Sequence, residues 1–285
     1  MTTLKKVGAY GPAVVVSVVL TFVVGAVLPP PVGLAVFVGG LTVMVALLLG
    51  VGESSAVRVL FRARGLTLAE ADALAPAVAL LCQRGIPMNR LDLRVRDGVV
   101  PISACGVGRR TAVVSAGLVG AVRDGQLPVD QAAAVLGHGA GVVLSGAVRS
   151  DPALAFWTLP WQVIQRPASA LAVACRRLPL AAMAWKVRFV LAVVAAVQAV
   201  AAGQPVVALV LVTATALTYA ACAGGRAWAA TIMDIGDEQV ARAGLANALA
   251  RFLLRCSRSP STHERVHALT GPALRPRPAL VTSAP

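Results

Sequence analysis

Two pairs of long apolar segments are the strongest feature of the hydrophobic pattern. No charged residue occurs between residues 9 and 51, and the prolines at 29–31 divide this stretch into two runs. Each run holds about 20 residues, enough for a helix to cross the roughly 30 Å hydrocarbon core of a membrane. A second pair covers about residues 182–202 and 205–223 and is divided at Gly-Gln-Pro. Because proline ends helices, the pattern predicts four transmembrane helices in two hairpins.

Between the hairpins, the polar and apolar positions follow helical and strand-like spacings. Thr67 with Glu70 three residues later forms a capping-box pattern, which indicates the start of a helix. The predicted elements are a helix over 67–86, a β-hairpin over 91–105 around Asp97-Gly98, a strand over 110–118 and a long helix over 127–149 that begins near Pro128. The expected fold class is therefore an α-helical membrane protein with an α+β domain.

The same changes in pattern predict the division of the chain. A mixed helical segment follows the second hairpin, and the last residues are rich in proline, which is typical of disorder. The predicted parts are a transmembrane hairpin at 1–52, the α+β region at 53–178, a second hairpin at 179–224, a C-terminal helical part of the same domain at 225–271 and a disordered tail at 272–285.

Composition supports a membrane protein. The chain is 58% hydrophobic and 13% charged, with a mean hydropathy of +0.78, whereas soluble chains carry about a quarter charged residues. The net charge is +14, but aromatic residues make up only 4% and no basic run contains interleaved aromatics. A nucleic-acid partner is therefore not expected, and the expected partner is the lipid bilayer.

The positions of the cations predict the orientation. Lys5 and Lys6 precede the first span, and both hairpin turns are uncharged. Arg58, Arg62 and Arg64 follow the second span. Positive charge concentrates on the cytoplasmic side of membrane proteins, so both termini and the α+β domain are expected in the cytoplasm. The Arg-, Ala- and Val-rich usage is typical of a GC-rich bacterial genome, which makes a bacterial plasma membrane the expected location.

Residues 259–271 contain a literal His-Glu-x-x-His. His263 and His267 lie one helical turn apart with Glu264 beside them, which is the spacing of a zinc peptidase site. The helix can only be short, and residues 268–285 contain no His, Asp, Glu or Cys. A third ligand would have to come from Asp234, Asp237 or Glu238. A short surface helix is the favoured interpretation, and a zinc site here is the alternative.

A second stretch has a wider resemblance. "ISACGVGRRTAVVSAGLV" at 102–119, followed by "LPVDQAAAVLGHGAG" at 127–141, resembles the HtpX-like membrane zinc metallopeptidases, relatives of the type I CAAX prenyl proteases. In that family "NAFAxGxxxTVVVTxGLL" precedes the zinc helix "AVLAHExGHV". Paired spans, a cytoplasmic zincin-like domain, two more spans, a Glu-x-x-x-Asp helix and a "THPSxxERI" segment occur in this order, and "SPSTHERV" corresponds to the last.

The resemblance implies a role for single positions. His138 matches the first zinc ligand, but Gly139 stands at the position of the catalytic Glu and Val142 at that of the second His. In the later helix Asp234 matches the family's Asp, which puts Ala230 at the third-ligand position. Glu264 and Arg265 match the family's closing structural motif. The resemblance therefore implies that the literal His-Glu-x-x-His is a chance match.

These replacements remove the chemistry that the resemblance implies. A structural zinc ion draws roughly 10 kcal/mol or more from a full ligand set, which the single imidazole of His138 cannot supply. Loss of the general acid/base alone costs about 10²- to 10⁴-fold in rate. No cofactor is therefore expected, and zinc is expected only if an active site exists elsewhere.

The leading hypothesis is a membrane-anchored pseudopeptidase that binds peptides or membrane-protein segments, or regulates an active relative. An extended peptide could add to the predicted strand at Thr111, Ala112, Val113, Val114 and Ser115 by β-augmentation. The first alternative is an active zinc endopeptidase of the HtpX-like family. The second is a transporter or pore, which is disfavoured because the spans contain no acidic residue that could line an ion path.

Overall fold

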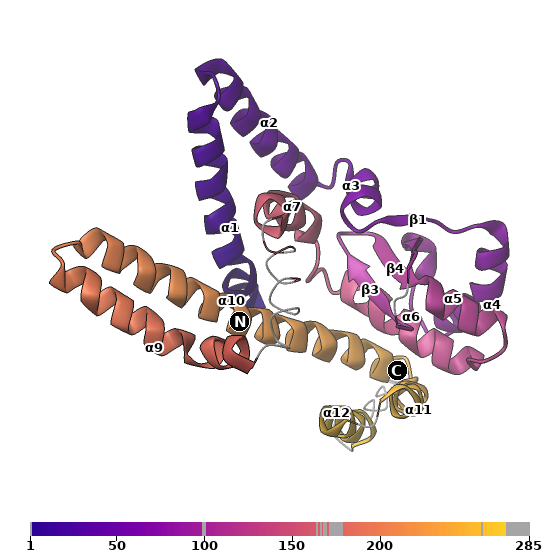
Figure 1. The fold of residues 1–285 in the computed structure, drawn as a ribbon. Coiled ribbons are helices and arrows are strands. Elements are labelled where there is room, and N and C mark those ends of the chain that lie inside the picture. Colours follow the sequence, from indigo (N-terminus) through magenta and orange to yellow (C-terminus); the bar gives the residue numbers. More distant parts are fainter. Residues whose placement is uncertain are drawn as a thin grey trace, which may run out of the picture. The chain divides into compact units, whose positions relative to one another are not determined.

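The computed structural model describes residues 2–98, 101–163, 165, 167, 170, 179–257 and 259–271. The chain forms two compact units, whose elements are labelled in Figure 1. Met1–Met44 and Leu154–Ala230 form what we call the helical unit, and Val45–Ala153 and Thr231–Pro285 form the mixed unit. The tail expected at 272–285 lies outside the described residues.

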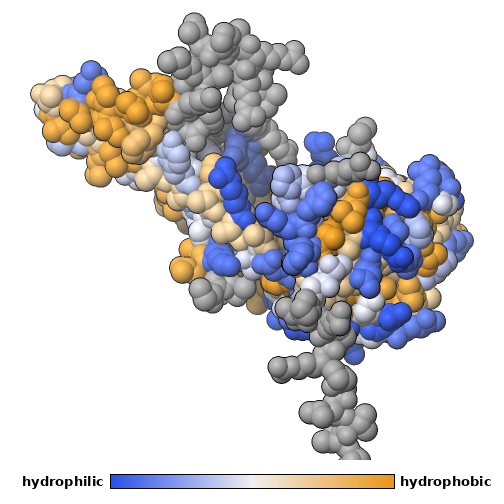
Figure 2. Space-filling model, turned by 90° about the horizontal axis from the view of Figure 1, so that it is seen from below, coloured by the Kyte–Doolittle hydropathy of each residue, from blue (hydrophilic) through white to orange (hydrophobic). Residues whose placement is uncertain are grey.

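Long apolar helices build the helical unit. Three described helices are long and apolar enough to cross a membrane, as expected for a membrane protein: α1 Thr2–Val27, α2 Pro30–Leu49 and α10 Pro205–Arg242. The fourth expected span corresponds to α9 Pro179–Ala201, in which the described side chains give a shorter apolar stretch, Phe189–Ala201. Figure 2 shows the apolar surface of the α9–α10 hairpin in orange and the mostly hydrophilic surface of the mixed unit in blue.

The prolines at 29–31 separate the first two helices as the sequence predicts. α1 ends at Val27 and α2 begins at Pro30, because the first turn of a helix tolerates proline. Glycines allow the two helices to approach at this turn, since a Cβ at Gly33 would lie only 2.7 Å from the carbonyl oxygen of Gly25.

α10 differs from the predicted boundary near residue 224. It continues without a break for 38 residues, which corresponds to about 57 Å, and a membrane core needs only about 30 Å. The sequence becomes more polar at Arg226, but the same helix continues through this position and no new helix begins there. From Thr231 onward the residues of α10 belong to the mixed unit.

A four-stranded sheet forms the centre of the mixed unit. Its strands are β1 Ala63–Gly65, β2 Asp92–Arg96, β3 Ala104–Val107 and β4 Thr111–Ser115, in the order β1-β2-β4-β3. β2 and β4 run parallel, and the other two pairs are antiparallel. The helices are α3 Glu53–Leu60, α4 Leu68–Gln83, the 3-10 turn Met88–Arg90, α5 Ala116–Arg123, α6 Val129–Leu144, α7 Asp151–Trp157 at the border of the units, α11 Ala246–Cys256 and α12 Pro260–Thr270.

The hairpin expected around Asp97-Gly98 is wrong. β2 and β3 flank this dipeptide in the sequence, but β4 lies between them in the sheet. Gly98 has a φ of 118°, as the chain turn requires, while the Asp97 carboxylate bonds to Arg64 of β1. The dipeptide therefore ends β2, and the chain continues to a strand that is not the neighbour of β2 in the sheet. A local turn signal cannot tell such a connection from a hairpin.

The peptide-binding strand expected at Thr111–Ser115 has no free edge. Every residue of β4 pairs with β2 on one side, and Thr111–Val114 pair with β3 on the other, and the whole strand is buried. The Thr111 hydroxyl donates to Glu53 at 3.2 Å, and the Ser115 hydroxyl accepts the backbone N–H of Leu118 and so caps α5. A peptide can add only to β1 or β3, the edge strands of this sheet.

One apolar core joins the sheet to α4, α5, α6 and α11. Its largest fully buried members in the mixed unit are Leu74, Leu81, Val95, Val114, Leu118, Leu136 and Val240. The burial of α6 is nearly complete, so the helix that carries His138 is held on several sides.

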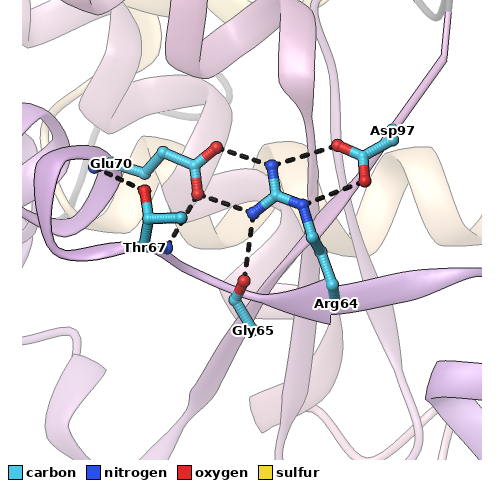
Figure 3. Close-up of polar contacts among 5 residues, drawn as sticks. All are labelled: Arg64, Gly65, Thr67, Glu70 and Asp97. Atoms are coloured by element: carbon cyan, nitrogen blue, oxygen red, sulfur yellow. Dashed lines mark hydrogen bonds and ion pairs between the residues drawn. The ribbon is translucent and has the colours of Figure 1, made fainter.

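Arg64 of β1 connects the sheet to the start of α4 (Figure 3). Its guanidinium donates to both carboxylate oxygens of Glu70 at 2.7 and 2.8 Å, and to Asp97 at 2.9 and 3.1 Å. Glu70 also accepts the Thr67 N–H at 2.8 Å, and Thr67 Oγ1 accepts the Glu70 N–H at 3.3 Å. The predicted capping box is confirmed.

We expect Glu70→Gln to lower the free energy of unfolding by about 1 kcal/mol at pH 7, a modest value because water screens the half-exposed pair. The bond from Arg64, with that from Thr67, lowers the pKa of Glu70 to about 2. The stabilisation is therefore present above the unfolded pKa of about 4.3 and is lost as the pH falls toward 2. Thermal unfolding in detergent, followed by circular dichroism, measures it. Asp72→Asn, at an exposed position of the same helix, should change little, and a constant difference between wild type and Glu70→Gln from pH 7 to 2 would contradict the assignment.

Candidate functional site

Two glycines in α6 and one in β3 allow close contacts near His138. A Cβ at Gly139 would lie 3.1 Å from the carbonyl carbon of Ala104 in β3, and one at Gly106 would lie 2.8 Å from the Gly139 oxygen. A Cβ at Gly141 would lie 2.5 Å from the Cβ of Gln239 in α10. The "GHGAG" stretch therefore packs backbone against β3 on one side and against α10 on another.

His138 forms a chain of polar contacts with the end of α10 and with α12. Its Nδ1 lies 3.0 Å from Oδ1 of Asp237. Arg265 donates to the same carboxylate twice, from Nε to Oδ2 and from Nη2 to Oδ1, both at 2.7 Å. The side chains are mostly buried, with exposed fractions of 15% for His138, 12% for Asp237 and 25% for Arg265. Three helices thus meet at one carboxylate.

This geometry assigns the tautomer of His138. Asp237 lies in the part of α10 that belongs to the mixed unit, outside the membrane-spanning part. Burial alone would raise the pKa of Asp237, but the hydrogen bonds from Arg265 and His138 outweigh it and lower the pKa. An ionised carboxylate only accepts hydrogen bonds, so Nδ1 of His138 is the donor. In the neutral ring the lone pair is then on Nε2.

A histidine held by a carboxylate through one nitrogen is the arrangement that orients metal-binding imidazoles. The rest of a zinc site does not fit here. Gly139, at the family's Glu position, faces the backbone of β3, and Val142, at the second His position, is buried in an apolar cluster with Val143 and Val148. Among the described residues, no group of three or more His, Cys, Asp or Glu is placed to hold a metal.

The residues expected on the later helix are placed differently. Asp234 is exposed, and the acid that contacts His138 is Asp237, one turn further along α10. Ala230 is exposed and belongs to the helical unit. If Asp237 is the Asp of the Glu-x-x-x-Asp spacing, the third-ligand position falls on Met233, which is also exposed. Neither side chain completes a zinc site. Arg265, expected to be structural, is the residue that binds Asp237.

The literal His-Glu-x-x-His forms part of α12. His263, Glu264 and His267 are all exposed on this helix, and Nδ1 of His263 lies 3.0 Å from the carbonyl oxygen of Ser259 in the preceding turn. Ser259 caps the helix by accepting the N–H of Thr262 at 3.2 Å. Asp237, one of the acids considered as a third ligand, bonds to Arg265 and His138 instead.

Sequence reasoning missed two residues that the structure places at key contacts. Asp237 was considered only as a ligand for the His263 site. Glu53, at the start of α3, accepts the N–H groups of Arg109 and Arg110 at 2.9 and 3.1 Å. The neighbouring Gly236 was a usable signal for Asp237, because a glycine inside a helix marks a close approach.

Comparison of the chain with protein-family models, with curated proteins and with solved structures found no match. The likeness to HtpX-like peptidases therefore stays an expectation from the order of motifs in the sequence.

Gly236 allows the imidazole of His138 to lie directly against α10. A Cβ at this position would overlap Nδ1 and Cε1 of the ring. We expect Gly236→Ala to displace His138 from Asp237 and to lower the free energy of unfolding by about 1–3 kcal/mol. Gly225→Ala in the same helix is the matched control, since nothing lies within 4 Å of its Cβ position, and it should be neutral or stabilising. Equal unfolding temperatures for the two variants would contradict this packing.

Arg265→Gln should lower the free energy of unfolding by about 3 kcal/mol, because it leaves the buried Asp237 carboxylate without its cationic partner and with only the hydrogen bond from His138. Arg242→Gln is the control, because that arginine pairs with Glu238 at an exposed position and should contribute less than about 1 kcal/mol. Denaturant unfolding in detergent measures both. Equal losses of unfolding free energy in the two variants would show that the pair with Asp237 stabilises the fold no more than an exposed ion pair does.

Proposed function

We propose that this chain is a membrane-anchored, non-hydrolytic relative of zinc metallopeptidases, a scaffold that binds peptides or segments of membrane proteins. The observation that carries the proposal is the packing around His138. The imidazole is oriented as a metal ligand would be, while the backbone of β3 fills the space at Gly139 and apolar side chains surround Val142. In this proposal, His138 keeps the carboxylate contact that orients a metal-binding histidine, but the catalytic Glu and the second His are replaced by Gly139 and Val142.

The free edge of β3 is the peptide-binding surface that fits this function. Among the described residues β3 pairs with β4 alone, and α6 packs against it through Gly106 and Gly139. An extended segment adding to this edge would run beside the helix that carries His138. Main-chain hydrogen bonds would supply affinity with little dependence on side chains, which suits a scaffold for varied segments.

The location belongs to the same proposal. We place α9 in the membrane together with α1, α2 and α10, so that the chain crosses four times and both termini and the mixed unit lie in the cytoplasm of a bacterial cell. The charge distribution supports this sidedness, because Lys5 and Lys6 lie at the start of α1 and Arg58 and Arg62 follow α2.

Metal content and proteolysis test the proposal. Protein purified in detergent should contain substoichiometric zinc and should not cleave casein, because the donors around His138 cannot hold the ion or activate water. Stoichiometric zinc together with cleavage that EDTA abolishes would overturn it. In that event Glu264→Gln distinguishes the two places for the activity: loss of cleavage would assign it to His263 and His267, and unchanged cleavage would assign it elsewhere.

A further inference from the structure

The C-terminal end of α2 is tied to the turn between β3 and β4. Arg109 in this turn donates from Nη2 to the carbonyl oxygen of Leu48 at 2.5 Å, and so satisfies one of the last carbonyls of the helix. Glu53, which begins α3, accepts the N–H groups of Arg109 and Arg110 and the hydroxyl of Thr111. The turn and α3 are therefore fixed at the level at which α2 ends.

The length of α2 indicates where that level lies. The helix has 20 residues, about 30 Å, which matches the hydrocarbon thickness of a bilayer, and its last residue is Leu49. When α2 crosses the membrane, the residues that follow Leu49 lie among the lipid headgroups. The β3–β4 turn lies there too, because Arg109 contacts Leu48.

The exposed side chains at this junction suit an anionic bilayer surface. Ser55, Arg58 and Val59 are exposed on α3 at the spacing of one helix face, and Arg62, also exposed, follows the end of the helix. Val51 and Val59 are 65% and 73% exposed, so apolar groups accompany the cations. The four arginines 58, 62, 109 and 110 against the single acid Glu53 give 4 − 1 = +3. Among the described residues, the guanidinium groups of Arg58, Arg62 and Arg110 have no hydrogen-bond or ion-pair partner.

We infer that this junction, formed by residues 50–62 and 108–111, binds the headgroups of anionic phospholipids. Arg58 and Arg110 contact the lipid phosphates, which guanidinium groups match in geometry, while Val51 and Val59 enter the acyl boundary. Arg109 and Glu53 hold the turn in place. The position at the end of a span selects lipid over a soluble anion. The inference rests on α2 crossing the membrane, which is part of the proposed location, and is independent of the proposed scaffold role.

Lipid binding to the detergent-purified full chain, measured by native mass spectrometry, tests the inference. We expect phosphatidylglycerol to bind more tightly than phosphatidylcholine and this preference to weaken as salt is raised. Each cation near an anionic surface contributes about fivefold, so Arg58→Gln/Arg110→Gln should weaken phosphatidylglycerol binding roughly 30-fold. Phosphatidylcholine binding should not change.

The double variant Arg123→Gln/Arg242→Gln is the matched control. It removes the same charge from two arginines whose side chains are 68% and 61% exposed, on α5 and at the end of α10. It should bind phosphatidylglycerol as the wild type does. Equal losses in the two double variants would reduce the effect to net charge and overturn the site. Equal binding of the two lipids by the wild type, or no salt dependence, would also overturn it, whether or not the variants fold.

Discussion

Asp237 joins three helices that are far apart in the sequence, and the arrangement around His138 depends on it. Burying a carboxylate costs several kcal/mol, so Asp237 requires compensation at this place. Arg265 of α12 supplies a bidentate pair, and His138 of α6 supplies a further hydrogen bond. The contact fixes the rotation of α10 relative to α6, because Asp237 reaches the imidazole only with Gly236 beneath the ring.

In our proposal, the close packing that requires glycines in α6 and α10 also explains why no metal site forms at His138. Gly139 lets the backbone of α6 approach that of β3, while Gly141 and Gly236 make room for the side chains of Gln239 and His138. Glycine lowers helix propensity by about 1 kcal/mol at each position, so these residues weaken the isolated helices. The dense packing of the assembled unit offsets this cost, since interiors at crystal-like density recover dispersion and burial energy.

Local signals in the sequence predicted the local parts of the structure. Length and apolarity identified α1, α2 and the apolar part of α10, and Thr67 with Glu70 identified the start of α4, because these features depend on neighbouring residues. Sheet order depends on distant pairing, so the dipeptide Asp97-Gly98 could not reveal that β4 lies between β2 and β3. The sequence offered one signal for Asp237 over Asp234, the neighbouring Gly236, but both acids lie on one helix and only the packing of α6 shows which of them is buried.

The backbone spacing explains why simple substitutions would not convert this position into a peptidase site. A glutamate at position 139 would crowd the main chain of β3, because its Cβ would lie 3.1 Å from the carbonyl carbon of Ala104, and β3 pairs with the buried strand β4. A histidine at position 142 would place a polar ring among Val143, Val148 and the partly buried Ile232 and Ile235, without a hydrogen-bond partner in that apolar cluster. In our proposal, the reactive groups are therefore missing at positions where the described packing leaves little room for them. A role in binding requires neither, because it depends on the strand edge and on the rigidity that the Asp237 contacts give to the helices beside it.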